Sequence, residues 1–147
     1  MRQWNSWGDS SVKMTVNAKA STFIQSLLGK GTPLTDATLS EVMAKVPASR
    51  LPEHPLIAID AETRVRHARG QSLPDWLAWR SGDIGVFPDG VALPRNSTQV
   101  AELLALAKQH NWVVIPYGGG TSVVGHINPV ADERPILTLA LTHLNHL

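Results

Sequence analysis

Three consecutive glycines, Gly118 to Gly120, follow an apolar run and constrain the fold more than any other feature of the sequence. Because glycine has no Cβ, this turn can adopt positive φ and lets a ligand approach the main-chain N–H groups. Successive N–H groups in such a loop can bind an anion, and the hydroxyls of Thr121 and Ser122 can donate further hydrogen bonds. The stretch 115–122 therefore predicts a diphosphate-binding turn, and a plain tight turn between two strands stays open as the alternative.

Two familiar phosphate-binding motifs do not fit this stretch. A dinucleotide fingerprint G-x-G-x-x-G that starts at Gly118 needs a glycine where Val123 stands. A P-loop from Gly120 to Gly125 needs Lys and then Ser or Thr, but His126 and Ile127 follow instead. An unrelated nucleotide-binding fold is therefore only weakly supported.

The residues around the glycines predict a βαβ unit. A short strand over 91–93 stops at Pro94, and a helix capped by Asn96 or Ser97 runs to Asn111. Its expected apolar face consists of Val100, Leu103, Leu104 and Ala107. The uninterrupted apolar run 112–115 is typical of a strand covered on both faces, and a further strand is expected over 136–141. A right-handed crossover places the glycine loop at the carboxyl end of the second strand, where open α/β sheets bind ligands.

The first half of the chain predicts three helices. Apolar residues at helical spacing indicate a helix over 18–28 that ends at Gly29. The pair Thr38 and Glu41 has the spacing of a capping box for a second short helix, which Pro47 stops before a connecting loop over 47–55. A third helix opens with Ser72, Pro74 and Asp75 and ends at Gly82. The alternation of Val12, Met14 and Val16 favours an edge strand in an arm that docks on the fold.

Positive charge gathers at Arg64, Arg66, His67 and Arg69. We interpret this cluster as a solvated face, with a contact to an anionic substrate or partner as the functional alternative. Residues 69–82 are also candidates for the border of a cleft.

The composition indicates a globular protein that is not built for nucleic acid. The 147 residues carry 13 Lys and Arg against 12 Asp and Glu, without a basic block that would follow a phosphate backbone. The chain has no cysteine, which excludes disulfides and Cys-based metal sites, and no metal site is predicted. Without an apolar run long enough to span a membrane or a signal-peptide core, we expect no transmembrane segment and a cytoplasmic location.

Motifs at both ends of the chain resemble one family. The loop Pro116-Tyr117-Gly118-Gly119-Gly120-Thr121-Ser122, with Pro94 and the helix after it, resembles the first half of the FAD-binding domain of the vanillyl-alcohol oxidase superfamily, also called the PCMH-type domain. The start Arg2-Gln3-Trp4-Asn5-Ser6-Trp7-Gly8-Asp9 is similar to the W-N-G-W-G start of alkyldihydroxyacetonephosphate synthase-like members. The segment Pro88 to Leu93 and the L-x-x-L-N-x-L ending over 141–147 extend the resemblance across the chain.

The resemblance implies an α+β fold: a helical amino-terminal region over 1–85, then the first, incomplete FAD subdomain with its βαβ unit over 86–147. It also implies that the loop holds the FAD diphosphate without a covalent bond, because Thr121 stands where covalently linked members have His. The expected FAD-binding residues are Pro116, Tyr117, Gly118, Gly119, Gly120, Thr121, Ser122 and Gly125. His126 stands where relatives commonly have glycine, so either a solvent-facing role or a flavin contact remains open for it.

Two functions follow as expectations. In the first, the chain is the FAD-binding part of a synthase-like or oxidase-like flavoenzyme whose catalytic residues and cap domain for a small-molecule or lipid-like substrate lie beyond Leu147. In the second, the chain is a truncated, non-catalytic remnant or interaction module. This second reading expects exposed apolar surface and, with it, association into a homo-oligomer.

Overall fold

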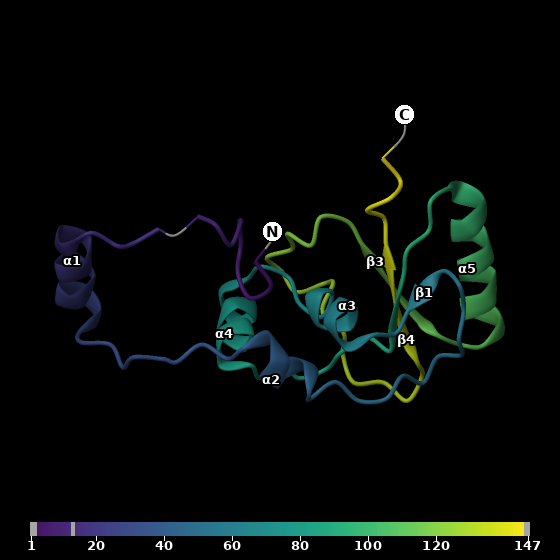
Figure 1. Ribbon diagram of the computed structural model, residues 1–147, viewed down its shortest axis with the longest axis horizontal. Coiled ribbons are helices and arrows are strands. Elements are labelled where there is room, and N and C mark those ends of the chain that lie inside the picture. The colour runs from purple at the N-terminus through teal and green to yellow at the C-terminus, as the bar shows by residue number, and fades with distance from the viewer. Residues whose placement is uncertain (1–2, 13, 146–147) are drawn as a thin grey trace.

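A computed structural model describes residues 3–12 and 14–145 of the chain and shows a four-stranded sheet with helices on both faces (Figure 1). The strand order is β1-β2-β4-β3. These strands span Ile57–Ala58, Gly90–Ala92, Ile136–Ala140 and Val113–Tyr117 in that order. Strands β2, β4 and β3 are parallel, whereas β1 pairs with β2 in the antiparallel sense. The predicted α+β fold with a strand–helix–strand unit is confirmed.

Strand β4 lies in the interior of the sheet, whereas β3 lies at its edge. All five residues of β4 are buried, and the strand pairs with β2 on one side and β3 on the other. In β3 only Tyr117 is buried, because this strand lies at the edge of the sheet. The prediction that the run 112–115 is covered on both faces is therefore wrong: its apolar residues are half-buried edge positions, except Trp112, which is buried just before the strand.

Helix α5, Ser97–Gln109, packs on one face of the sheet (Figure 1). Its N-cap is Asn96, as predicted, and the side chain accepts a hydrogen bond from the N–H of Gln99. Leu103 and Ala107 are buried against Leu137 and Leu139 of β4, while Val100 packs at the margin of this cluster. Leu104 was assigned to the same face but is 45% exposed, because the packed stripe is narrower than the apolar pattern.

Three short helices contribute to a second core cluster. They are α2 (Leu39–Met43), α3 (Ala61–Arg66) and α4 (Leu73–Ser81). The predicted capping box of Thr38 with Glu41 begins α2, and the predicted cap at Ser72 begins α4, where Asp75 completes a second capping box. The cluster consists of Val42, Val65, Ala68, Trp79, Ile84 and Phe87. Trp4 packs its ring edge-to-face on Trp79 at 6.1 Å, so the amino-terminal arm docks here as expected.

Helix α1 has the predicted bounds, Ala18–Leu28, but stands apart from the sheet and the other helices (Figure 1). Asn17 caps its start, and Gly29 ends it with φ at 78°. None of its residues is buried, and the described residues that lead into and out of it are exposed. Val12, Met14 and Val16 are exposed and belong to no strand, so the predicted edge strand is wrong. Within residues 3–12 and 14–145, none of the sheet strands pairs with this stretch.

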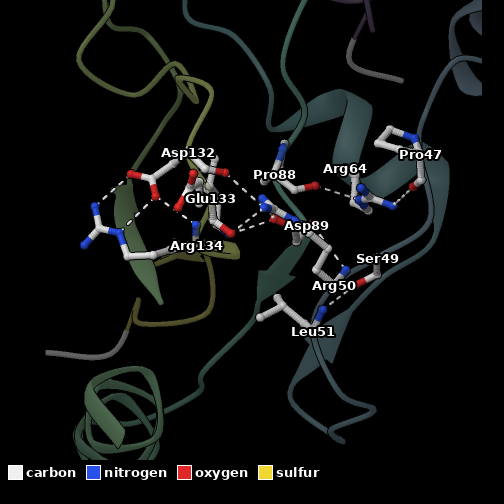
Figure 2. A network of polar contacts seen from close by, with 11 residues as sticks. Pro47, Ser49, Arg50, Leu51, Arg64, Pro88, Asp89, Asp132, Glu133 and Arg134 are labelled. Carbon is white, nitrogen blue, oxygen red and sulfur yellow. Dashed lines mark hydrogen bonds and ion pairs between the residues drawn. The ribbon is translucent and has the colours of Figure 1, made fainter. Parts of the chain in front are cut away.

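Arginines of the first half fasten the two halves of the chain (Figure 2). The guanidinium of Arg50 makes two hydrogen bonds to the buried carboxylate of Asp89, with Nη2–Oδ2 at 2.6 Å, and its Nη1 also donates to the carbonyls of Asp132 and Glu133. Arg64 donates from Nε to the carbonyl of Pro88 at 2.7 Å. The Asp89 carboxylate also accepts from the N–H of Ile136 at 2.7 Å, so it ties β4 to the same point.

The positive cluster is not the solvated face that its charge pattern suggests. Arg64 is only 2% exposed, and this burial lowers its pKa below the usual arginine value. Arg66 forms an ion pair with Glu62, and Arg69 donates to the carbonyl of Ile84. These three cations therefore have partners within the fold, and Arg64 in α3 donates to the main-chain carbonyls of Pro47 and Pro88.

Among residues 3–12 and 14–145, no helix has the length and apolar character needed to cross a bilayer. The described part of the chain also lacks any group of three or more His, Cys, Asp or Glu residues placed to bind a metal ion.

Candidate functional site

The glycine loop begins where β3 ends, at the carboxyl edge of the three parallel strands, as predicted. Gly118, Gly119 and Thr121 are exposed, Ser122 is half-buried, and Gly120 is buried. Positive φ occurs at Gly120 (70°) and Gly125 (75°) and not at the first two glycines of the triplet. The exposed part of the loop thus consists of Gly118, Gly119 and Thr121, and the chain reverses direction at Gly120.

The three glycines differ in what surrounds them. A Cβ built on Gly118 would meet no atom within 4 Å, and one on Gly119 would meet only the Thr121 Cγ2 at 3.9 Å. A Cβ on Gly120 would collide with the ring and hydroxyl of Tyr117. Glycine is therefore required by the fold at Gly120, whereas a Cβ at Gly118 or Gly119 would clash with nothing. Their lack of one keeps the space beside the loop open.

Tyr117 fixes the start of the loop from below. It is 2% exposed, its hydroxyl donates to the carbonyl of Arg66 at 3.3 Å, and its ring lies 4.7 Å from the ring of His67. Among the predicted binding residues, Tyr117 and Gly120 therefore support the turn, while Pro116 is exposed at the strand end. The other predicted residues of the loop lie nearer its surface: Gly118, Gly119 and Thr121 are exposed, and Ser122 is half-buried.

A second segment, Arg69 to Gln71, lies against the loop from the other side. The N–H of Gln71 donates to the carbonyl of Ser122 at 2.6 Å, and the N–H of Gly70 donates to Oδ1 of Asn128 at 2.9 Å. A cavity of about 180 Å³ between this segment, the arm and the loop is lined by Trp7, Gly8, Gln71, Gly119 and Thr121. The prediction that residues 69–82 border a cleft fits Gln71, which lines this cavity.

His126 lies on the outer turn of the same loop. Its side chain is exposed, and its Nδ1 makes a 2.9 Å hydrogen bond with the Ser122 hydroxyl. The ring therefore contacts a residue of the predicted binding set.

Gln71 and Asn128 were not expected at this site from the sequence. Neither belongs to a motif, and Gln71 lies 47 or more positions before the glycines along the chain. Only Asn128 offered a weak signal, because an Asn-Pro pair marks a turn. Their position depends on how α4 packs, which local sequence patterns do not specify.

Comparison with known proteins identifies the class of this site. Residues 88–147 match the protein family described as FAD binding domain, and this segment holds β2, α5, β3, the glycine loop and β4. The resemblance to FAD-linked oxidases is thereby confirmed, and FAD is the cofactor of the family that these residues match. Residues 88–147 are therefore similar to an FAD-binding domain; residues 146 and 147, the end of the L-x-x-L-N-x-L segment, lie outside the described residues.

Among individual proteins, the chain is similar to alkyldihydroxyacetonephosphate synthases. It is 37% identical over 86 residues to that of Dictyostelium discoideum and 34% identical over 93 residues to that of Trypanosoma brucei brucei. These matches cover 58% and 62% of this chain but only 14% and 15% of the two relatives. A match to the glycolate oxidase subunit GlcD of Bacillus subtilis is shorter, at 30% identity over 61 residues, or 42% of this chain and 12% of that protein.

Solved structures agree on the fold. Two structures of alkyldihydroxyacetonephosphate synthase, in space groups P1 and P212121, superpose with TM-scores of 0.75 and 0.73 at 24% identity. Each superposition covers 99% of this chain and about a third of the other chain, 33% and 34%. The fold is thus that of a part of these enzymes, including the amino-terminal region before residue 88.

Proposed function

We propose that this chain is the FAD-binding part of a flavoenzyme that resembles alkyldihydroxyacetonephosphate synthase, and that the loop Pro116 to Ser122 holds the FAD diphosphate. The observation that carries the proposal is the open space beside Gly118 and Gly119, at the carboxyl edge of the parallel strands. Neither glycine is needed there by the fold, so a close-approaching ligand is the physical reason for the missing side chains.

The residues present fit a diphosphate. The main-chain N–H groups of such a loop and the hydroxyls of Thr121 and Ser122 are neutral donors, which suit an anion at a loop between strand and turn. Tyr117 and Gly120 hold the turn in shape from beneath. When bound, the flavin supplies the redox-active ring, and the role of this chain is to bind and orient the diphosphate end.

Synthase-like rather than oxidase-like chemistry is the function that we favour for the whole enzyme. The synthase relatives match over 86 and 93 residues, which extends well before the FAD-binding segment, whereas GlcD matches over 61. The Trp4 and Trp7 arm adds to this preference, since Trp4 is packed into the second core cluster. The substrate of the whole enzyme would be a lipid-like or other small molecule.

A titration of FAD into the purified chain tests the proposal, with quenching of flavin fluorescence as the signal. Gly119→Val should weaken binding by at least about tenfold, because its side chain fills the space that the diphosphate needs, while the fold has room for it. Gly31→Val is the matched control: Gly31 also has negative φ and open surroundings, but it lies in the segment after α1. Gly120→Val is a poor probe, because its strain against Tyr117 deforms the loop itself.

Circular dichroism on the same samples shows whether each variant is folded. Binding that survives Gly119→Val unchanged in a folded protein would refute the assignment of the diphosphate to this loop. A folded wild-type chain that does not quench FAD at all would favour the non-catalytic alternative.

A further inference from the structure

Two segments that are distant in the sequence meet at both ends of the outer turn of the glycine loop. Gln71 N–H holds the Ser122 carbonyl at 2.6 Å, and Gly70 N–H holds the Asn128 side chain at 2.9 Å. Asn128 also donates its own N–H to the carbonyl of Gly125 at 3.0 Å. The stretch 122–128 is thus fastened at its first and last residue to two consecutive main-chain donors.

The side-chain amide of Asn128 is oriented by a buried carboxylate. Its Nδ2 donates to Oδ1 of Asp75 at 2.7 Å, and Asp75 is only 1% exposed. Ser72 holds the other carboxylate oxygen through its N–H at 3.0 Å and its hydroxyl at 2.6 Å. If the amide were flipped, its oxygen would face the carboxylate and its NH₂ would face the Gly70 N–H, so only one orientation satisfies both neighbours.

Packing leaves this contact little freedom. A Cβ on Gly70 would collide with the Ser122 carbonyl, and one on Gly125 would lie 3.4 Å from Asn128 Nδ2. The indole N–H of Trp79, in α4, donates to the carbonyl of Gly70 at 3.3 Å. The segment at Gly70 is therefore held by α4 while it holds the loop.

We propose that Asn128 is a positioning residue for the flavin loop, and that the relay Asp75–Asn128–Gly70 presets the loop for the diphosphate. The inference rests on the proposed function of the loop. With the Ser122 carbonyl committed to Gln71, the trans peptide turns the N–H of Val123 away from that segment. A loop that is already ordered binds more tightly because less conformational entropy is lost on binding.

Asn128→Asp gives a test with a pH signature that a purely structural role would not produce. The new carboxyl faces Asp75 across the present 2.7 Å contact, so at pH 8 two like charges push the loop away from the segment at Gly70. At pH 5 a shared proton restores the hydrogen bond. We expect FAD affinity relative to wild type to be about tenfold lower at pH 8 and to recover at pH 5.

Two charged or titratable groups near this contact are present in both wild type and variant, so they affect both measured affinities. They are Arg69, whose Nη1 lies 3.7 Å from Asp75 Oδ1, and His126, which contacts Ser122. Taking the ratio of the two affinities at each pH cancels the contributions that wild type and variant share. Asn17→Asp is the matched control, because it adds the same charge at the N-cap of α1 and should leave the ratio near one at both pH values.

The outcomes separate this inference from the function on which it rests. If wild type binds FAD and Asn128→Asp binds equally at both pH values, the positioning role is wrong and the loop assignment stands. If wild type does not bind FAD, both the assignment of the loop and the positioning role of Asn128 are wrong. Should Asn128→Asp be unfolded at pH 8, Asn128→Ala removes both hydrogen bonds without a charge; we then expect about tenfold weaker binding by folded protein, and unchanged binding would overturn the role.

Discussion

Helices α1 and α5 have similar amphipathic sequences, but the apolar face of α5 is buried and that of α1 is exposed. Both are capped by an asparagine, at Asn17 and Asn96, and both carry apolar residues at helical spacing. In α5, Leu103 is fully buried against the sheet, whereas Leu27 of α1 is 67% exposed (Figure 1). An amphipathic pattern and a cap therefore specify that a helix forms and where it ends, but the partner determines whether its apolar face stabilises the protein.

The largest effect that this comparison predicts is at the packed helix. Leu103→Ala should lower the free energy of unfolding by about 3 kcal/mol, because it leaves a cavity between α5 and β4. Urea unfolding followed by circular dichroism measures this. The neighbouring Leu104→Ala, at a position 45% exposed, is the control and should change the value by less than about 1 kcal/mol. Equal effects of the two substitutions would contradict the packing of α5.

An intermediate effect is expected where the sheet is fastened to the first half of the chain. Burial of the Asp89 carboxyl opposes its ionisation, but hydrogen bonds from Arg50 and the Ile136 N–H outweigh this, so the pKa of Asp89 lies below its usual value. Asp89→Asn should lower the free energy of unfolding by about 2 kcal/mol at pH 7.

The pH dependence of that effect has a defined sign. A lowered folded-state pKa means that the stabilisation by Asp89 is complete above the usual aspartate pKa of about 3.9 and is lost as the pH falls through the folded-state pKa. The difference between wild type and Asp89→Asn should therefore shrink in urea unfolding below about pH 4. Asp36→Asn, in the exposed pair with Arg80, is the control and should show at most about 0.5 kcal/mol at any pH. If the difference in unfolding free energy between wild type and Asp89→Asn stayed constant down to pH 2, ionised Asp89 and its pairing with Arg50 would be ruled out as its cause.

The smallest effect is expected in α1. Leu27→Ala should change the free energy of unfolding by no more than about 0.5 kcal/mol, because its side chain is exposed and contributes nothing to either core cluster. The same urea experiment applies. A loss comparable to that of Leu103→Ala would show that the apolar face of α1 is covered in solution.

Local features of the fold were largely predictable from the sequence. The bounds of α1, the capping box at Thr38, the cap at Ser72, and the end of α4 at Gly82 follow from short-range chemistry that acts within a few residues. Long-range order was not predictable to the same degree. The apolar run 112–115 suggested a strand covered on both faces, but β4 inserts between β2 and β3 and leaves β3 at the edge of the sheet. A sequence pattern does not specify this strand order.

The candidate site divides in the same way. The glycine loop and its place at a strand end were expected from the glycines themselves, whereas the contacts of Gly70 and Gln71 with Ser122 and Asn128 depend on tertiary packing. Arg64 shows how tertiary packing can also overturn a prediction from charge. A basic cluster predicts exposed side chains, but Arg64 in α3 is buried and donates to the carbonyls of Pro47 and Pro88.

The most direct test of the central claim is a ¹H–¹⁵N NMR titration of the labelled 147-residue chain with FAD, which reports each main-chain N–H separately. If the loop holds the diphosphate, the amide signals of Gly118, Gly119, Thr121 and Ser122 should shift most and to saturation, while those of α1 stay in place. Saturable shifts confined to other parts of the chain, with the loop signals unmoved, would contradict the account.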